Sequence, residues 1–179
     1  HFDAPVHGGK GLASVDLVRT SELFGPAVVI DVTAQAKADE DYAVSVADIE
    51  AWESAHGAIP TGAIVLMRSG WPERWTQGDA YYNRGEDGHL HFPGFSVEAA
   101  EFLISERDIA GIGVDTGSVD PGNANSFPTH GVVNGSGGFH LENLADMSAL
   151  PESGAYLIVA PIKIEGGSGG QVRVFAVVL

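Results

Sequence analysis

Continuous apolar runs rich in Val and Ile alternate with two capped helical segments, and this alternation restricts the fold more than any other feature. The apolar runs cover 26–33, 62–70, 109–116, 154–164 and 172–179. Such runs, bounded by polar or Gly-containing loops, indicate buried strands. The segments 45–57 and 96–108 begin with Ser45 and Ser96, a preferred N-cap residue type, and carry a helical pattern. Strands alternating with helices, followed by a strand-rich end, predict one α/β domain over residues 1–179 with a mixed sheet.

Charge and cysteine content exclude several classes of partner. A formal net charge of −15, with only nine Lys and Arg in 179 residues, argues against nucleic acid and anionic membrane surfaces. No apolar run approaches the roughly 20 residues that span a membrane. Cysteine is absent, which excludes disulfides and thiolate ligands and favours a reducing, cytoplasmic location. Any metal site must therefore use His, Asp and Glu.

The opening heptad, "HFDAPVH", places potential metal ligands at alternate positions. In an extended segment alternate side chains share one face, so we expect His1, Asp3 and His7 to point the same way. We also expect Pro5 to keep this segment extended. Imidazole nitrogen and carboxylate oxygen suit Zn²⁺, Mn²⁺ or Fe²⁺. The alternative interpretation is a solvent-exposed tail whose histidines are incidental.

Two long stretches, 72–94 and 117–140, exceed the length of simple connectors, and such stretches in compact domains are usually functional. The motif "DTGSVDPG" leaves a predicted strand, where α/β proteins place their sites. Further along, "FPTHGVVNGSGGFHLENL" carries His130 and, twelve residues later, Glu142. Without other information, a capped loop and a solvated helix start are the favoured explanation of this pair.

Together these segments resemble the cyclase family of metal-dependent hydrolases, which includes bacterial kynurenine formamidases and isatin hydrolases. That family carries H-x-G-T-H-x-D-x-P-x-H near its N-terminus, and the opening heptad matches the H-x-D-x-P-x-H portion. The family's S-x-D-x-G loop is matched by Ser118, Asp120 and Gly122, and its later His and Glu by His130 and Glu142. The "RSGW" and "HFPGFS" segments are most similar to the isatin hydrolase branch. The first motif His would precede His1 by four residues, so we read the sequence as N-terminally incomplete.

The resemblance implies a swivelling β/β/α domain, a central mixed sheet or barrel flanked by helices, that forms dimers or higher oligomers. It implies that His1 and Asp3 bind a divalent metal together with the missing upstream His. His7 then lies beside the ion and transfers a proton, and His130 and Glu142 act in proton transfer or second-metal binding. Similarity to isatin hydrolases favours manganese, and similarity to formamidases favours zinc.

Aromatic residues near these motifs have two interpretations. Trp71, Phe92 and Phe95 either form flat apolar walls for an aromatic substrate or belong to the core. The other histidines are expected to be surface or loop residues, with His140 at an exposed strand edge; they are His56, His89, His91 and His140.

The leading functional hypothesis is a metal-dependent hydrolase that opens a small aromatic cyclic amide such as isatin. An arylformamidase acting on N-formylkynurenine uses the same chemistry with a different pocket. A non-catalytic binding module on this scaffold is a third class, since the first motif His is not present. A copper oxidase using an amino-terminal His1 brace would leave "SVDPG" and the His130/Glu142 pair unexplained. Apolar edges, above all the last strand, favour a homodimer or higher homo-oligomer.

Overall fold

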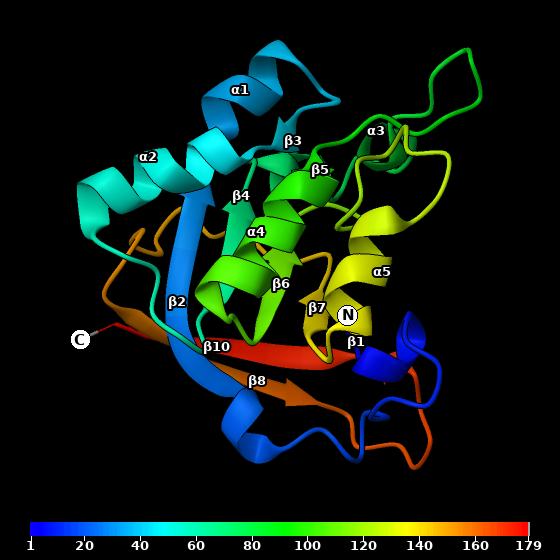
Figure 1. Cartoon of the computed structure of the whole chain (residues 1–179). Helices are drawn as coiled ribbons and strands as arrows, with labels where there is room; N and C mark the ends of the chain where they lie inside the picture. Colours follow the sequence, from blue (N-terminus) through cyan, green and yellow to red (C-terminus); the bar gives the residue numbers. More distant parts are fainter. Residues whose placement is uncertain (179) are drawn as a thin grey trace.

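The computed structural model describes residues 1–178 and places most strands in one eight-stranded sheet of order β10-β8-β2-β4-β6-β7-β1-β9 (Figure 1). The strands are β1 (Phe2–Asp3), β2 (Phe24–Asp31), β3 (Ala43–Val44), β4 (Ile64–Arg68), β5 (Gly94–Phe95), β6 (Gly111–Val114), β7 (Phe139–Leu141), β8 (Ala155–Pro161), β9 (Gly169–Gly170) and β10 (Val172–Val178). The α-helices are α1 (Thr33–Ala38), α2 (Val46–His56), α3 (Asp79–Tyr82), α4 (Val97–Arg107) and α5 (Pro128–Gly135), and the 3₁₀ helices are η1 (Pro5–His7), η2 (Thr20–Glu22) and η3 (Trp71–Arg74).

The central strands β2, β4, β6 and β7 pair in parallel and are buried on both faces, as their unbroken apolar runs predict. Val28 and Ile30 of β2 face a core cluster that includes residues of α2, α4 and α5, whereas Val29 faces the opposite cluster. These three helices therefore cover one face of the sheet (Figure 1). The burial of successive residues on alternate faces follows from the two-residue period of a strand.

Both predicted helix starts are confirmed. At α2 the Ser45 hydroxyl accepts a hydrogen bond from the Asp48 N–H (3.3 Å), and the Asp48 carboxylate accepts one from the Ser45 N–H (2.8 Å). At α4 the Ser96 hydroxyl accepts from the Ala99 N–H (3.1 Å). These bonds satisfy N–H groups that the first turn of a helix leaves free.

The sheet nearly closes on itself. Strands β8 and β10 pair at one edge, and β9, which lies between them in the chain, pairs with β1 at the other edge. The chain thus joins the two edges, and the mixed sheet flanked by helices is the fold that the family resemblance implied. The last predicted strand is present through Val178, and Leu179 lies outside the described residues.

The prediction that the opening heptad stays extended is wrong. Strand β1 ends at Asp3, and Pro5 begins the 3₁₀ helix η1. Proline suits this first helical position because its φ is fixed near −65° and its missing N–H would have no helical partner there. His7 is therefore brought back toward Asp3 by a turn instead of by strand alternation.

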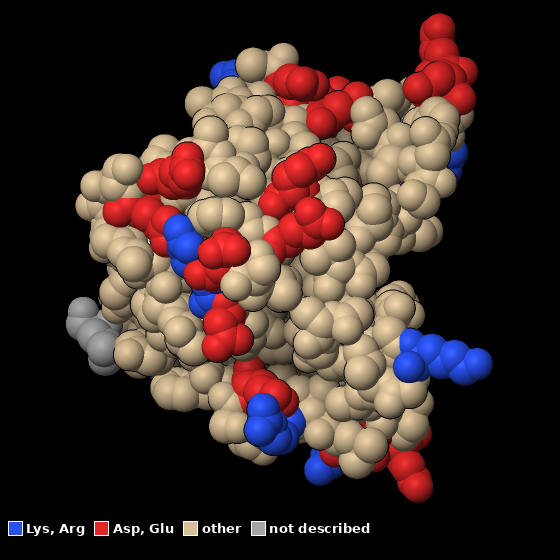
Figure 2. Space-filling model, in the orientation of Figure 1, with Lys and Arg blue, Asp and Glu red and all other residues tan. Residues whose placement is uncertain are grey.

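The surface agrees with the charge argument. Acidic side chains are spread over several elements on the face in Figure 2 and outnumber the basic ones, as 24 Asp and Glu against nine Lys and Arg require. Within residues 1–178, no helix is both long enough and apolar enough to cross a bilayer.

Candidate metal and active site

The start of β1 lies against the end of β7. This contact brings the opening heptad next to Glu142, the last residue of the predicted motifs. The amino group of His1 donates to the Glu142 carbonyl oxygen (3.1 Å), and the Glu142 N–H donates to the His1 carbonyl oxygen (3.0 Å). Glu142 directly follows β7, so the site forms where the parallel strands β6 and β7 end.

Asp3 is the centre of the site. Its Oδ1 lies 3.4 Å from His1 Nδ1 and 3.4 Å from His7 Nδ1, yet this buried oxygen has no hydrogen-bond partner among residues 1–178. Burial first, and then the nearby Glu142 carboxylate, raise the pKa of Asp3 to about 6. A buried carboxylate oxygen in this position lacks a hydrogen-bond donor, and a metal ion is one way to satisfy it.

His7 and His130 face each other across the site. Their ring centroids are 5.9 Å apart, with His7 on η1 and His130 on α5. The side chains of His1 and His7 are 44% and 41% exposed, whereas Asp3 and Glu142 are buried. The cluster is therefore open to solvent on the side of His1 and His7.

Two carboxylates hold His130. Its Nδ1 lies 2.5 Å from Asp120 Oδ2, and its Nε2 lies 3.2 Å from Glu142 Oε1. Burial opposes the charged ring, but the hydrogen bonds with Asp120 and then Glu142 prevail and raise the pKa of His130 to about 9. Asp120 also accepts the N–H groups of Thr129 and His130, so the S-x-D-x-G loop anchors the start of α5. This positioning role of Asp120 was not predicted, although its motif was matched.

The expectation that His140 lies at an exposed strand edge is wrong, because its exposure is 0%. Its ring centroid lies 4.6 Å from that of His130. Burial, and then the neighbouring His130 and His7, lower the pKa of His140 well below its usual value. Among residues 1–178, two groups could hold a metal ion, each with ligand atoms within 4.8 Å of one another: His1, Asp3 and Glu142, and Asp3, His130 and His140.

The predicted aromatic wall is mostly interior. Phe95 is fully buried in the core cluster beneath the helices. Trp71 and Phe92 pack with Tyr81, whose hydroxyl donates to Asn143 Oδ1 (2.6 Å) beside Glu142. A substrate contact by Trp71 or Phe92 stays a prediction. Sequence reasoning did not consider Phe127, which is 70% exposed and whose ring centroid lies 5.4 Å from that of His130.

The remaining histidines bond with surface carboxylates or lie in solvent. His56 Nε2 lies 3.0 Å from Glu152 Oε2, His91 Nδ1 lies 2.9 Å from Asp41 Oδ2, and His89 is exposed.

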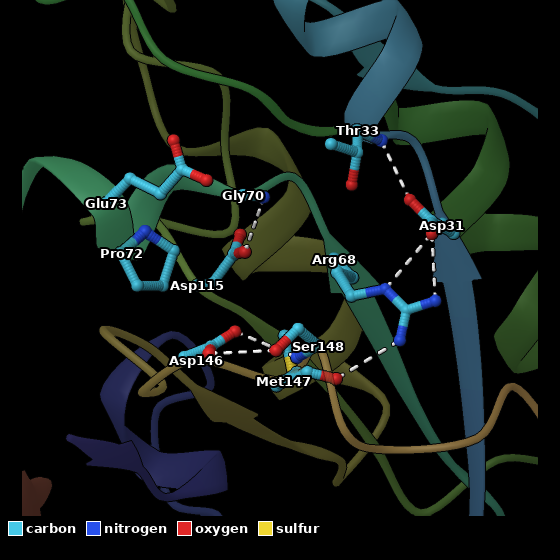
Figure 3. A pocket seen from close by; sticks show the side chains of 10 residues that line it. All are labelled: Asp31, Thr33, Arg68, Gly70, Pro72, Glu73, Asp115, Asp146, Met147 and Ser148. Atoms are coloured by element: carbon cyan, nitrogen blue, oxygen red, sulfur yellow. Dashed lines mark hydrogen bonds and ion pairs between the residues drawn. The ribbon is translucent and has the colours of Figure 1, made fainter.

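A separate cavity of about 500 Å³ lies at the ends of β2 and β4 (Figure 3). Its ten lining residues include no histidine. Its one arginine, Arg68, donates to Asp31 and to the carbonyl oxygens of Met147 and Leu150. The lining of this cavity is acidic, and the Arg68 guanidinium is already hydrogen-bonded within the protein. The cavity therefore does not share the catalytic groups of the histidine cluster.

Comparison with known proteins agrees with this geometry. The family model named Cyclase matches residues 1–121. An isatin hydrolase of Roseibium aggregatum is 38% identical over 99% of this chain and 70% of its own length. A kynurenine formamidase of Delftia acidovorans is 28% identical over 97% of this chain and 72% of its own length. An isatin hydrolase solved with the product analogue thioisatinate superposes with a TM-score of 0.93, at 36% identity over 98% of this chain and 69% of that one. The chain belongs to the cyclase family of metal-dependent hydrolases.

Proposed function

We propose that this protein is a metal-dependent hydrolase that opens a small aromatic cyclic amide of the isatin type. The observation that carries the proposal is Asp3 Oδ1, a buried carboxylate oxygen without a partner among the described residues, set between two imidazoles. Isatin hydrolases among the relatives support the substrate class.

The residues fit a divalent cation. His1 and Asp3 are the proposed ligands, and Glu142 offers a third atom within 4.8 Å of both. Nitrogen and oxygen donors of this kind suit Mn²⁺ or Zn²⁺, and we favour Mn²⁺ because of the likeness to isatin hydrolases. When bound, the ion supplies polarisation of the amide carbonyl and lowers the pKa of water at its open position.

The protein's own side chains then move the protons. His7, half-exposed beside Asp3, takes a proton from the attacking water as its oxygen bonds to the carbonyl carbon. When the C–N bond breaks, the same imidazole returns that proton to the departing nitrogen. His130, held between Asp120 and Glu142, acts in proton transfer or in binding a second metal ion.

A formamide is the second candidate substrate, because the kynurenine formamidase relative shares this family. Both substrates carry an aromatic ring beside the amide, for which Trp71 and Phe92 are the proposed walls. The exposed apolar face of β10 supports a homodimer or larger homo-oligomer.

Hydrolysis of isatin and of N-formylkynurenine should be measured side by side, before and after removal of metal by a chelator. We expect faster turnover of isatin, loss of activity without metal, and recovery with Mn²⁺ or Zn²⁺. Full activity in protein shown to be metal-free by elemental analysis would refute the proposal. Metal binding without turnover of either substrate would favour a non-catalytic module.

A further inference from the structure

His140 is a buried imidazole whose polar atoms are unsatisfied. It lies in the middle of β7 with 0% exposure, and neither Nδ1 nor Nε2 has a hydrogen-bond partner within residues 1–178. Buried polar atoms of native proteins are nearly always bonded, because leaving them without a partner costs free energy. A residue of this kind therefore indicates a species that binds between it and its neighbours.

The neighbours of His140 identify where that species would lie. In the antiparallel pairing of β1 and β7, Asp3 stands opposite His140, so both side chains leave the sheet on the same face. His130 reaches the same point from α5, with its ring centroid 4.6 Å from that of His140. Asp3 Oδ1 is itself buried and unpartnered among the described residues. Unsatisfied atoms of Asp3 and His140 thus converge without bonding to each other.

The donor set favours a cation over a hydrogen-bonded group. One oxygen of Asp3 and one nitrogen each of His130 and His140 lie within 4.8 Å of one another. Two imidazoles and a carboxylate are ligands for a divalent transition metal. Asp120 binds Nδ1 of His130, which is the carboxylate contact that commonly orients a metal-binding imidazole, and Nε2 of the same ring lies 3.2 Å from Glu142 Oε1.

We propose that His140 is a ligand of the divalent metal held by Asp3, so that strand β7 supplies a nitrogen donor in addition to those near the chain start. This inference rests on the proposed function, because it requires that the protein bind such a metal. It adds a ligand that is absent from the matched sequence motif, in which only His130 and Glu142 of this region appear.

The test uses His140→Leu, which fills a similar volume without a ligand atom, and His140→Gln, which keeps a polar side chain. His56→Leu is the matched control, because His56 lies on α2 and bonds with Glu152. Affinities for Mn²⁺ and Zn²⁺ are measured by calorimetry on metal-free protein. Nitrogen coupling to bound Mn²⁺ is measured by pulsed electron paramagnetic resonance. Circular dichroism and thermal unfolding of the metal-free variants confirm their folding.

We expect His140→Leu to bind metal at least about 10-fold more weakly, since even outer-shell partners of a metal site contribute 10–100-fold. Nitrogen coupling should fall, and His140→Gln should bind with intermediate affinity. The metal-free His140→Leu protein should unfold at the same temperature as the wild type or a higher one, because an unsatisfied polar group has been removed. His56→Leu should bind metal as the wild type does.

Unchanged affinity and unchanged nitrogen coupling in a folded His140→Leu variant would overturn the assignment and indicate a water molecule at this point. That result would leave the proposed function intact, provided that the wild type binds metal. If the wild-type protein binds neither Mn²⁺ nor Zn²⁺, the proposed function and this inference both fail.

Discussion

Replacing Asp120 with Asn tests how the site holds His130. Asp120 is 1% exposed and accepts hydrogen bonds from Thr129 N–H (2.8 Å) and from His130 Nδ1 (2.5 Å). The amide keeps the size of the side chain but removes its charge. It also replaces one acceptor oxygen by an NH₂ group, so that two hydrogen-bond donors then face each other.

The expected loss of stability follows from the pKa of His130. Its folded value of about 9 lies above its ordinary 6.5, and a shift of that size corresponds to about 3 kcal/mol. Glu142 contributes part of the shift and solvent screens part of it, so we assign about 1–2 kcal/mol to Asp120. Because the folded pKa is raised, this stabilisation is fully present below about pH 6.5 and is lost as the pH rises through about 9.

The assay is urea unfolding of metal-free wild type and Asp120→Asn at about pH 6 and about pH 10. We expect the variant to be less stable at the lower pH and the difference to shrink at the higher one. Asp39→Asn is the control, since the exposed Asp39 side chain accepts a hydrogen bond from the Asp41 N–H, which the Asn oxygen can also accept. With metal restored, turnover should fall by roughly 10²–10⁴-fold. An equal stability difference at both pH values, or turnover near that of the wild type, would refute the reasoning.

Three further outcomes are expected. Asp3→Ala should lose both metal and activity, whereas His7→Ala should keep most of the metal and lose roughly 10²–10⁴-fold in turnover; equal metal loss in both would make His7 a ligand. Hydrogen bonds to Asp41 and then Asp87 raise the pKa of His91. His91→Gln should therefore lower the unfolding temperature at about pH 5.5, where the ring is charged, and leave it unchanged at pH values well above the raised pKa. Sedimentation at micromolar concentration should show a dimer or larger species, and a clean monomer would contradict the proposed assembly through the exposed β10 edge.

Local patterns in the sequence were sufficient for most elements of the fold. Unbroken Val- and Ile-rich runs predicted β2, β4 and β6 because burial on both faces leaves no polar alternation. Ser45 and Ser96 predicted where α2 and α4 begin, because capping depends on residues only three apart. The motif residues Asp3, His130 and Glu142 were also identified, although nothing local shows that residues almost 140 positions apart would meet.

Tertiary structure decided how those residues are used. The letters "FHLE" place His140 on the opposite face of β7 from Phe139 and Leu141, and we expected solvent there. Helix α5 brings His130 against that face, and β1 pairs with the strand, so the imidazole is buried beside Asp3. The two-residue period of a strand determines which side chains share a face, but only long-range packing determines whether that face meets water, a helix or a metal.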